Sequence, residues 1–226
     1  MCGRFALTAP ASAIAEIFQV DVLPEVLPRY NVAPSQQVAA LVRQEDGTRQ
    51  MTTFRWGLIP SWAKDPKIAY KMINARSETA ASKPAFRAAF KRRRCLILAD
   101  GFYEWTRRSK TDKVPHLIQL DDGRPFAMAG IWERWVSPEG EEILSTAILT
   151  TGPNELMEPI HNRMPVILPT EREADWLDPE ASREALQELL VPFDAASMQE
   201  RIVTKRVNNA RHEGPDVQGA PEEEEA

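Results

Sequence analysis

Cys2, the second residue, could give the chain an unusual reactive terminus. Because initiator methionine is normally removed before a small residue, we expect the mature chain to begin at Cys2. An α-amine has a pKa near ~7.7–8.0 and is partly neutral at cell pH, and a cation such as Arg4 favours the reactive thiolate. A 1,2-aminothiol condenses with an aldehyde to an imine and then closes a thiazolidine ring. The terminus therefore predicts an aldehyde trap, with an ordinary small residue near a frayed end as the alternative.

A second polar segment is Ile73-Asn-Ala-Arg-Ser-Glu78. Asn74 could hydrogen-bond to a reacting group and orient it, and Arg76 could bind a phosphate with two parallel hydrogen bonds. The same residues also fit the start of a helix, with Asn74 as the N-cap and Glu78 in the first turn. Taken alone, Asn74 fits this helix start somewhat better.

Glu104 and His161 are the candidates for proton transfer. Glu104 lies between aromatic residues, and a carboxyl group in apolar surroundings has a raised pKa and can exchange protons near neutrality. His161 lies in a loop between Pro159 and Pro165, and histidine is the usual proton shuttle near pH 7. An outward-facing Glu104 on a strand and an ordinary surface His161 remain open alternatives.

Several cations and aromatic residues indicate nucleic-acid binding. Lys91-Arg-Arg-Arg94 is a run of four cations, although such a run is usually only a solvated face. Trp62 lies in a loop marked by Pro and Gly, where an aromatic ring can stack on an unpaired base. Phe86 could insert between bases as an apolar wedge, and Arg87 beside it adds a cation.

Composition excludes some classes of protein. The chain has 226 residues, a net charge of −5, two cysteines and three histidines. Two cysteines make no disulfide framework, no spacing fits a zinc site, and no apolar run approaches the roughly 18–20 residues of a membrane span. We therefore predict a cytoplasmic protein that needs neither metal nor cofactor.

The elements that position these residues form an α+β pattern. Short strands at hairpin spacing with few helices favour antiparallel sheets in a single domain over residues 1–212, followed by an acidic, disordered tail over 213–226. The expected strands are 38–42, 50–56, 94–99, 102–106, 116–120, 125–132, 142–151 and 202–207. The expected helices are 9–19, 76–90 with a break at Pro84, and two within 170–190, where Thr170 and Glu173 match a capping box.

Six ordered motifs resemble the SRAP (SOS response-associated peptidase) family. They are Met-Cys-Gly-Arg-Phe at 1–5, Arg-Tyr-Asn-Val-Ala-Pro at 29–34, Trp-Gly-Leu-Ile-Pro-Ser-Trp at 56–62, Ile-Asn-Ala-Arg-Ser-Glu-Thr at 73–79, Ala-Asp-Gly-Phe-Tyr-Glu-Trp at 99–105 and His-Asn-Arg-Met-Pro at 161–165. The resemblance implies coiled antiparallel β-sheets that form a barrel-like core with a few flanking helices around a positively charged cleft. It also implies a covalent DNA–protein crosslink with abasic sites in single-stranded DNA, formed by a monomer that is nucleoid-associated when bound to damaged DNA.

The resemblance assigns roles to individual residues. Cys2 would form a Schiff base and then a thiazolidine with the abasic sugar, which shields the lesion from strand cleavage. Asn74 would position the terminus and the sugar, Glu104 would act as the acid and base, and His161 would shuttle protons. Arg4 and Arg76 match phosphate-contacting residues, and Trp62 would line the DNA cleft.

Two other functions remain open at this stage. An N-terminal-nucleophile cysteine peptidase, including self-removal of Met1, is the first alternative to this lyase-like Schiff-base chemistry. A noncovalent module that binds single-stranded DNA is the second, and it would retain its function after Cys2→Ser.

Overall fold

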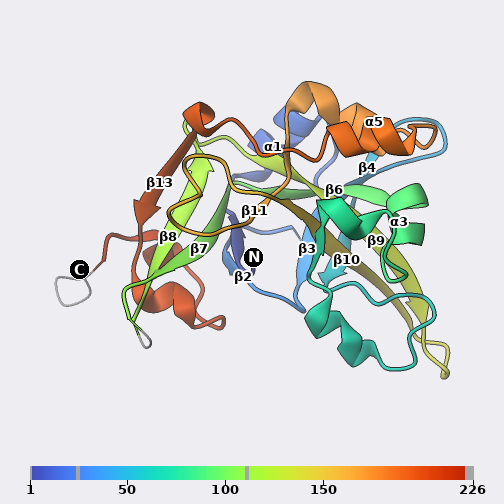
Figure 1. The fold of residues 1–226 in the computed structure, drawn as a ribbon, viewed down its shortest axis with the longest axis horizontal. Coiled ribbons are helices and arrows are strands. Elements are labelled where there is room, and N and C mark those ends of the chain that lie inside the picture. The colour runs from blue at the N-terminus through green and yellow to red at the C-terminus, as the bar shows by residue number, and fades with distance from the viewer. Residues whose placement is uncertain (1, 24–25, 110–111, 222–226) are drawn as a thin grey trace.

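The protein is built from two β-sheets with few and short helices (Figure 1). The computed structural model describes residues 2–23, 26–109 and 112–221. The strands are β1 Phe5–Leu7, β2 Arg29–Val32, β3 Gln37–Arg43, β4 Arg49–Trp56, β5 Asn74–Arg76, β6 Arg94–Ala99, β7 Gly101–Arg107, β8 Lys113–Leu120, β9 Phe126–Val136, β10 Glu142–Thr151, β11 Met164–Pro165, β12 Ile167–Leu168 and β13 Met198–Ile202. The α-helices are α1 Ala11–Phe18, α2 Ser77–Ala80, α3 Arg87–Arg92, α4 Glu173–Leu177 and α5 Arg183–Glu188.

Five strands close into a barrel. Along the sheet the order is β10-β4-β3-β6-β9, and β10 also pairs with β9, so the first and last strands meet. Closure removes the unpaired strand edges that an open sheet would expose. The pairings of β10 with β4 and with β5 are parallel, whereas the others in this sheet are antiparallel.

The second sheet is open and antiparallel, in the order β13-β8-β7-β1-β2. Its central strand β7 pairs with β1 on one side and with β8 on the other, so the first strand of the chain is held deep in the sheet. The side chain of Asp100 fixes the far end of β1, where it accepts a hydrogen bond from the Ala9 backbone N–H at 2.7 Å. The N-terminal segment is therefore a structural strand and not a frayed end.

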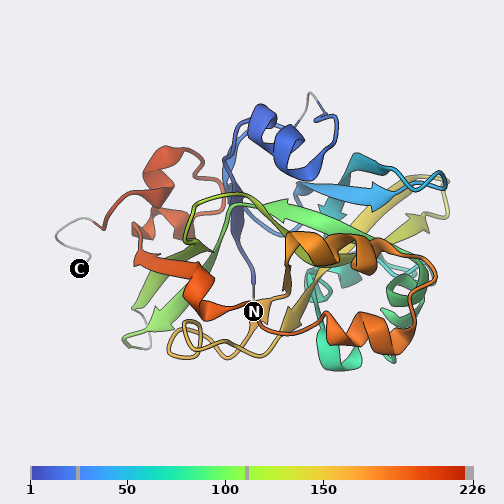
Figure 2. The ribbon, with the colours of Figure 1, turned by 90° about the horizontal axis from the view of Figure 1, so that it is seen from above.

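Alternation along the barrel strands divides the apolar residues into two clusters. One cluster joins Leu96 and Leu98 of β6 to the helices, including Phe18 of α1 and Phe90 of α3. The other joins Cys95 and its alternate neighbours to the open sheet, and it includes Cys2. Figure 2 shows the open sheet and the barrel as neighbouring bodies, with β1 running between them.

The α+β class with a barrel-like core of coiled sheets is confirmed. Several element boundaries differ from the sequence expectation. Asn74 begins strand β5 and does not cap a helix, because β10 offers it a parallel partner. The last strand is Met198–Ile202, and residues 205–208 form a 3₁₀ turn. Thr170 makes no capping hydrogen bond.

The C-terminal segment is ordered beyond the predicted boundary at residue 212. The Glu213 carboxylate accepts a hydrogen bond from the Asn31 backbone N–H at 3.1 Å and forms an ion pair with Arg29 at 2.9 Å. Val217 is fully buried within a 3₁₀ turn over Pro215–Gln218. Residues 213–221 therefore belong to the folded unit, and residues 222–226 lie outside the part of the chain that the structure describes.

Candidate functional site

Cys2 lies in the interior, just before β1, and its side chain is fully buried. The pairing of β1 with β7 fixes its position, since the Tyr103 backbone N–H donates to the Arg4 carbonyl at 2.9 Å. Both ribbon views place the start of the chain beside the segment between β10 and β11, which carries His161 (Figures 1 and 2). The two predicted chemical regions are thus brought together although they are far apart in sequence.

Asn74 holds the backbone of Cys2 directly. Its Nδ2 donates to the Cys2 carbonyl oxygen at 2.7 Å. Strand β5 is short, and its parallel pairing with β10 at Ile148 sets the position of Asn74. The Asn74 Oδ1 is buried and has no hydrogen-bond partner among the residues that the structure describes. A buried amide oxygen without a partner can accept a hydrogen bond from a bound ligand.

Glu104 is a buried carboxyl group beside Cys2. It lies in the middle of β7, opposite His116 of β8, and 4% of its surface is exposed. Burial raises its pKa above the ordinary value, and the charge of His161 partly opposes this effect. The charge of Glu104 in turn acts on the Cys2 thiol. A carboxyl group with a raised pKa can hold a proton near neutrality and release it during a reaction.

The His161 ring is oriented by its own loop. Its Nδ1 lies 3.0 Å from the Arg163 backbone nitrogen, which can donate to it, and 3.2 Å from the Arg163 carbonyl oxygen, which can accept from it when Nδ1 is protonated. The Arg163 guanidinium reaches Glu78 through two hydrogen bonds, one of them at 3.0 Å. This bidentate pair ties the His161 loop to α2, which directly follows Asn74–Arg76. Sequence reasoning named Glu78 only as a first-turn residue of a helix and gave Arg163 no role of its own.

The Cys2 thiol is not activated as the sequence suggested. Burial, reinforced by the charge of Glu104, raises the pKa of the thiol to about 12. Arg4 does not offset this, because its guanidinium donates to Asn31 Oδ1 and to the Val207 carbonyl, each at 2.7 Å. The thiol is therefore held protonated and needs a nearby base to accept its proton.

Comparisons with known proteins agree with this arrangement. The family described as "SOS response associated peptidase (SRAP)" matches residues 1–210. The chain belongs to the SRAP family. It is 47% identical to the abasic site processing protein YoqW of Bacillus subtilis, over 96% of this chain and 98% of that one. It is 31% identical to the abasic site processing protein HMCES of Rattus norvegicus, over 96% of this chain and 75% of that one.

Solved structures of similar proteins share the fold of this SRAP domain. A protein from Bacteroides thetaiotaomicron superimposes with a TM-score of 0.85 and 30% identity, over 97% of this chain and 99% of that one. A protein from Bordetella bronchiseptica superimposes with a TM-score of 0.79 and 30% identity, over 90% of this chain and all of that one. The barrel and the open sheet are therefore shared across nearly the whole chain.

The five residues predicted to contact DNA lie in different surroundings. Trp62 is 60% exposed and Arg76 is also exposed, so both side chains are accessible to a ligand. Arg87 is exposed on α3. Arg4 is half-buried by its two hydrogen-bond partners. Phe86 is 5% exposed and packs in the core, so it would have to leave the core to insert between bases.

Tyr70 is an exposed aromatic residue that sequence reasoning missed. It is 64% exposed, and the Arg55 guanidinium lies 5.8 Å from its ring centroid. Trp62 lies in the same connection between β4 and β5. Two exposed rings beside cations make a surface on which unpaired bases could stack. The sequence signal was weak because Tyr70 follows no turn motif.

The described part of this SRAP domain offers no preformed metal site. Within residues 2–23, 26–109 and 112–221, no group of three or more His, Cys, Asp or Glu side chains could hold a metal ion. No helix within these ranges is long and apolar enough to cross a membrane.

Proposed function

We propose that this protein forms a covalent thiazolidine crosslink between Cys2 and abasic sites in single-stranded DNA. The observation that carries the proposal is the hydrogen bond from Asn74 to the backbone of Cys2, in a buried site whose carboxyl group, Glu104, acts on the thiol. Membership of the SRAP family supports it, as do relatives named abasic site processing proteins. The crosslink would shield the lesion from strand cleavage by β-elimination.

The first step is imine formation at the aldehyde of the open-chain abasic sugar. After removal of Met1, the neutral amine of Cys2 adds to the aldehyde carbon and gives a carbinolamine. Glu104, whose pKa burial raises, donates a proton to the departing hydroxyl, which leaves as water. The unpartnered Oδ1 of Asn74 is suited to accept a hydrogen bond from the amine or from a sugar hydroxyl.

The second step closes the ring. Loss of water leaves a protonated imine that keeps one N–H of the amine. The Glu104 carboxylate takes the proton of the Cys2 thiol as sulfur adds to the imine carbon, and the electron pair of the C=N double bond moves to nitrogen, which gives a neutral thiazolidine N–H. The net reaction joins one aldehyde to one aminothiol with loss of one water. Ring closure is intramolecular and gains from effective molarities on the order of 10⁵ M or more. His161, whose charge acts on Glu104, can exchange protons in imine formation and in reversal of the adduct.

Surface cations and exposed rings support single-stranded DNA as the substrate. Arg76 could hold a phosphate, and Trp62 and Tyr70 could stack on bases next to the lesion. The protein is consumed in stoichiometric amounts unless the adduct reverses. The term enzyme therefore applies to the lyase-like Schiff-base step and not to a rapid turnover.

A denaturing gel tests the proposal. Purified protein, with Met1 removal verified by mass spectrometry, is incubated with a single-stranded oligonucleotide that carries one abasic site, beside an intact oligonucleotide. We expect a slowly migrating band that resists heat and needs no borohydride, and we expect Cys2→Ala to abolish it. A band seen only after borohydride reduction would mean an imine without ring closure, and absence of any band would refute the proposal.

Cys95 offers a matched control for Cys2. Both thiols are fully buried and both have a pKa raised to about 12, but Cys95 has no amine beside it. Cys95→Ala should therefore leave the crosslink intact. Loss of the crosslink in Cys95→Ala as well as in Cys2→Ala would attribute the effect to folding and not to chemistry.

A further inference from the structure

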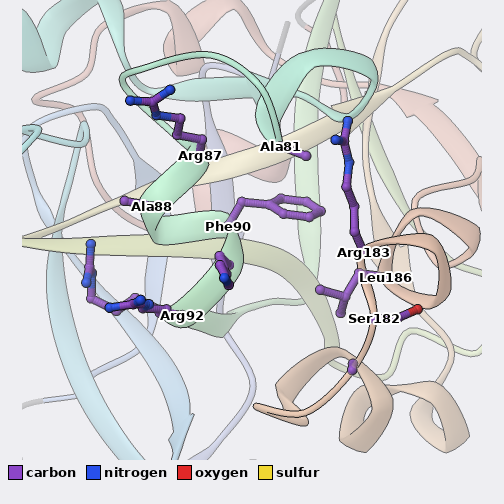
Figure 3. A pocket seen from close by; sticks show the side chains of 11 residues that line it. Ala81, Arg87, Ala88, Phe90, Arg92, Ser182, Arg183 and Leu186 are labelled. Carbon is purple, nitrogen blue, oxygen red and sulfur yellow. The ribbon is translucent and has the colours of Figure 1, made fainter.

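A pocket of about 780 Å³ lies between α3 and α5, away from the residues of the Cys2 site (Figure 3). Its cations come from both helices, and they are Arg87, Lys91, Arg92, Arg93 and Arg183. No acidic residue lines it, although the whole chain carries a net charge of −5. This is a local concentration of positive charge that the composition does not predict.

Most of this charge is not used within the protein. Arg93 pairs with Glu133 at 2.6 Å. Among the described residues, no acidic group pairs with Lys91, Arg92 or Arg183, and all three are exposed. Cations gathered without partners repel one another, so the folded protein gains if an anionic ligand binds there.

The floor of the pocket is apolar. Figure 3 shows the Phe90 ring pointing toward Arg183 and Leu186. Ala88 and Ala181 add methyl groups to the lining. A volume of this size is in the range of roughly 300–1,000 Å³ that is typical of ligand pockets. The pocket therefore combines an apolar floor, which takes a hydrophobic side chain, with a cationic rim, which takes carboxylates.

We propose that this pocket binds an acidic peptide of a partner protein, with one large apolar side chain inserted between α3 and α5. Charge complementarity and the apolar floor together favour a peptide over a DNA strand. Single-stranded DNA binds through exposed rings that stack on bases. Phe90 is the one aromatic residue of the lining, and it is only 2% exposed. Its ring packs edge-on against Trp176, with 5.8 Å between the ring centroids, so its face is not available for stacking on a base.

Binding here leaves the Cys2 site accessible. The Gln187 side chain of α5 donates to the Ser77 carbonyl at 3.1 Å, so the pocket wall is fixed to the segment that follows Asn74–Arg76. A peptide bound between α3 and α5 would thus tether its parent protein beside the crosslinking site without occupying it. The pocket would serve to recruit this protein to the place where damaged DNA occurs.

Fluorescence anisotropy tests the proposal with defined probes. The probes are fluorescein-labelled dodecapeptides of Asp, Glu and Gly with one central Phe, Trp, Leu, Ile or Met, and a control peptide with Ser at that position. We expect at least one apolar peptide to bind with a Kd below about 100 μM, and the Ser peptide to bind at least tenfold more weakly. Equal binding of the Ser peptide, or no binding by any of the peptides, would overturn the proposal.

Charge reversal locates the binding site. Lys91→Glu and Arg183→Glu should each weaken peptide binding at least tenfold. Arg108→Glu is the charge-matched control, because Arg108 is exposed in the turn between β7 and β8, at the other end of the molecule (Figure 1). Equal weakening by all three variants would show a nonspecific charge effect and overturn the proposal.

The crosslink serves as the independent readout. Arg183→Glu should leave crosslinking to abasic single-stranded DNA unchanged. If this variant instead weakens affinity for intact single-stranded DNA and leaves peptide binding unchanged, the pocket is part of the DNA surface and the peptide proposal is wrong.

Discussion

The two cysteines are equally buried, but the polar groups around them differ. Cys95 lies in the closed barrel, where its Sγ is 3.5 Å from Thr146 Oγ1 and its carbonyl accepts from Trp176 Nε1 at 3.0 Å. Cys2 lies where the open sheet meets the barrel, beside Asn74 and Glu104. Burial raises the pKa of each thiol to about 12. Thiol acidity therefore does not distinguish Cys2, which we propose to react, from Cys95.

Their neighbours make the distinction. The polar groups around Cys95 satisfy one another, as in the hydrogen bond from Thr146 Oγ1 to the Ile131 carbonyl at 2.9 Å. The Cys2 region instead keeps a buried amide oxygen of Asn74 that lacks a partner among the described residues, and a buried carboxyl group with a raised pKa. Buried groups of this kind cost folding free energy, and proteins keep them where they serve chemistry.

We expect Glu104→Gln to have the largest effect on the crosslinking rate. This change keeps the shape of the side chain but removes the group that donates and accepts protons. We expect the single-turnover crosslinking rate to fall about 10²–10⁴-fold, the usual contribution of general acid–base catalysis. Rates are measured by quenching on denaturing gels over a range of pH.

The pH dependence of the crosslinking rate also tests the role of Glu104. Because the pKa of Glu104 is raised, its protonated form persists to a higher pH than that of an ordinary carboxyl group. The wild-type rate should therefore lose its acid-catalysed part as pH rises through that raised pKa, and Glu104→Gln should lack this limb. A variant rate within twofold of the wild type would remove Glu104 from the mechanism.

Asn74→Ala should follow in size. The change removes the 2.7 Å hydrogen bond to the Cys2 carbonyl, so the terminus is no longer held against the sugar. Misplacement of a reacting group by about 1 Å can cost about 10²-fold in rate, and we expect a loss of that order. Asn74→Leu, which has nearly the same volume, is the matched control and should lose as much. Recovery of the rate in Asn74→Leu would show that packing, and not the hydrogen bond, positions Cys2.

A substitution inside the barrel should lower the stability of the protein and leave the crosslinking rate unchanged. Gly130 of β9 lies against β6, and an added Cβ would meet Cys95 Sγ at 2.7 Å and Ile97 Cδ1 at 2.8 Å. Gly130→Ala overpacks this interior and should lower the free energy of unfolding by about 1–3 kcal/mol. Urea unfolding measures the loss, and the crosslinking rate of the folded variant should stay unchanged. A slower crosslink would mean that the barrel and the Cys2 site are energetically coupled.

The sequence predicted the long strands because their apolar alternation is local. Strands β3, β4 and β10 lie close to the predicted ranges. Strands β1 and β5 have three residues each and were not predicted, since partners far away in sequence create them. For the same reason Asn74 looked like a helix cap.

The residue types of the site were readable from the sequence, but their environment was not. Cys2, Asn74, Glu104 and His161 were chosen for their chemistry. The protonated state of the Cys2 thiol depends on burial by the fold, and Arg4 turned away from it toward Asn31. The ion pair of Glu78 with Arg163 joins residues 85 positions apart, a distance that no local pattern reports.

The smallest expected effect is on the pH dependence of thermal stability, which reports the free-energy cost of burying the ionised Glu104 side chain. A carboxyl group whose pKa is raised in the folded state adds stability below its unfolded pKa, and that contribution disappears as pH rises through the folded pKa. Wild-type Tm should therefore fall relative to that of Glu104→Gln between pH 5 and pH 8. We expect the difference in Tm between the variant and the wild type to increase from pH 5 to pH 8, because only the wild type ionises a buried carboxyl group. Differential scanning calorimetry at both pH values measures it. A Tm difference that stays constant with pH would show that Glu104 is solvated when ionised, and the contrast between its site and the hydrogen-bonded surroundings of Cys95 would then lose its physical basis.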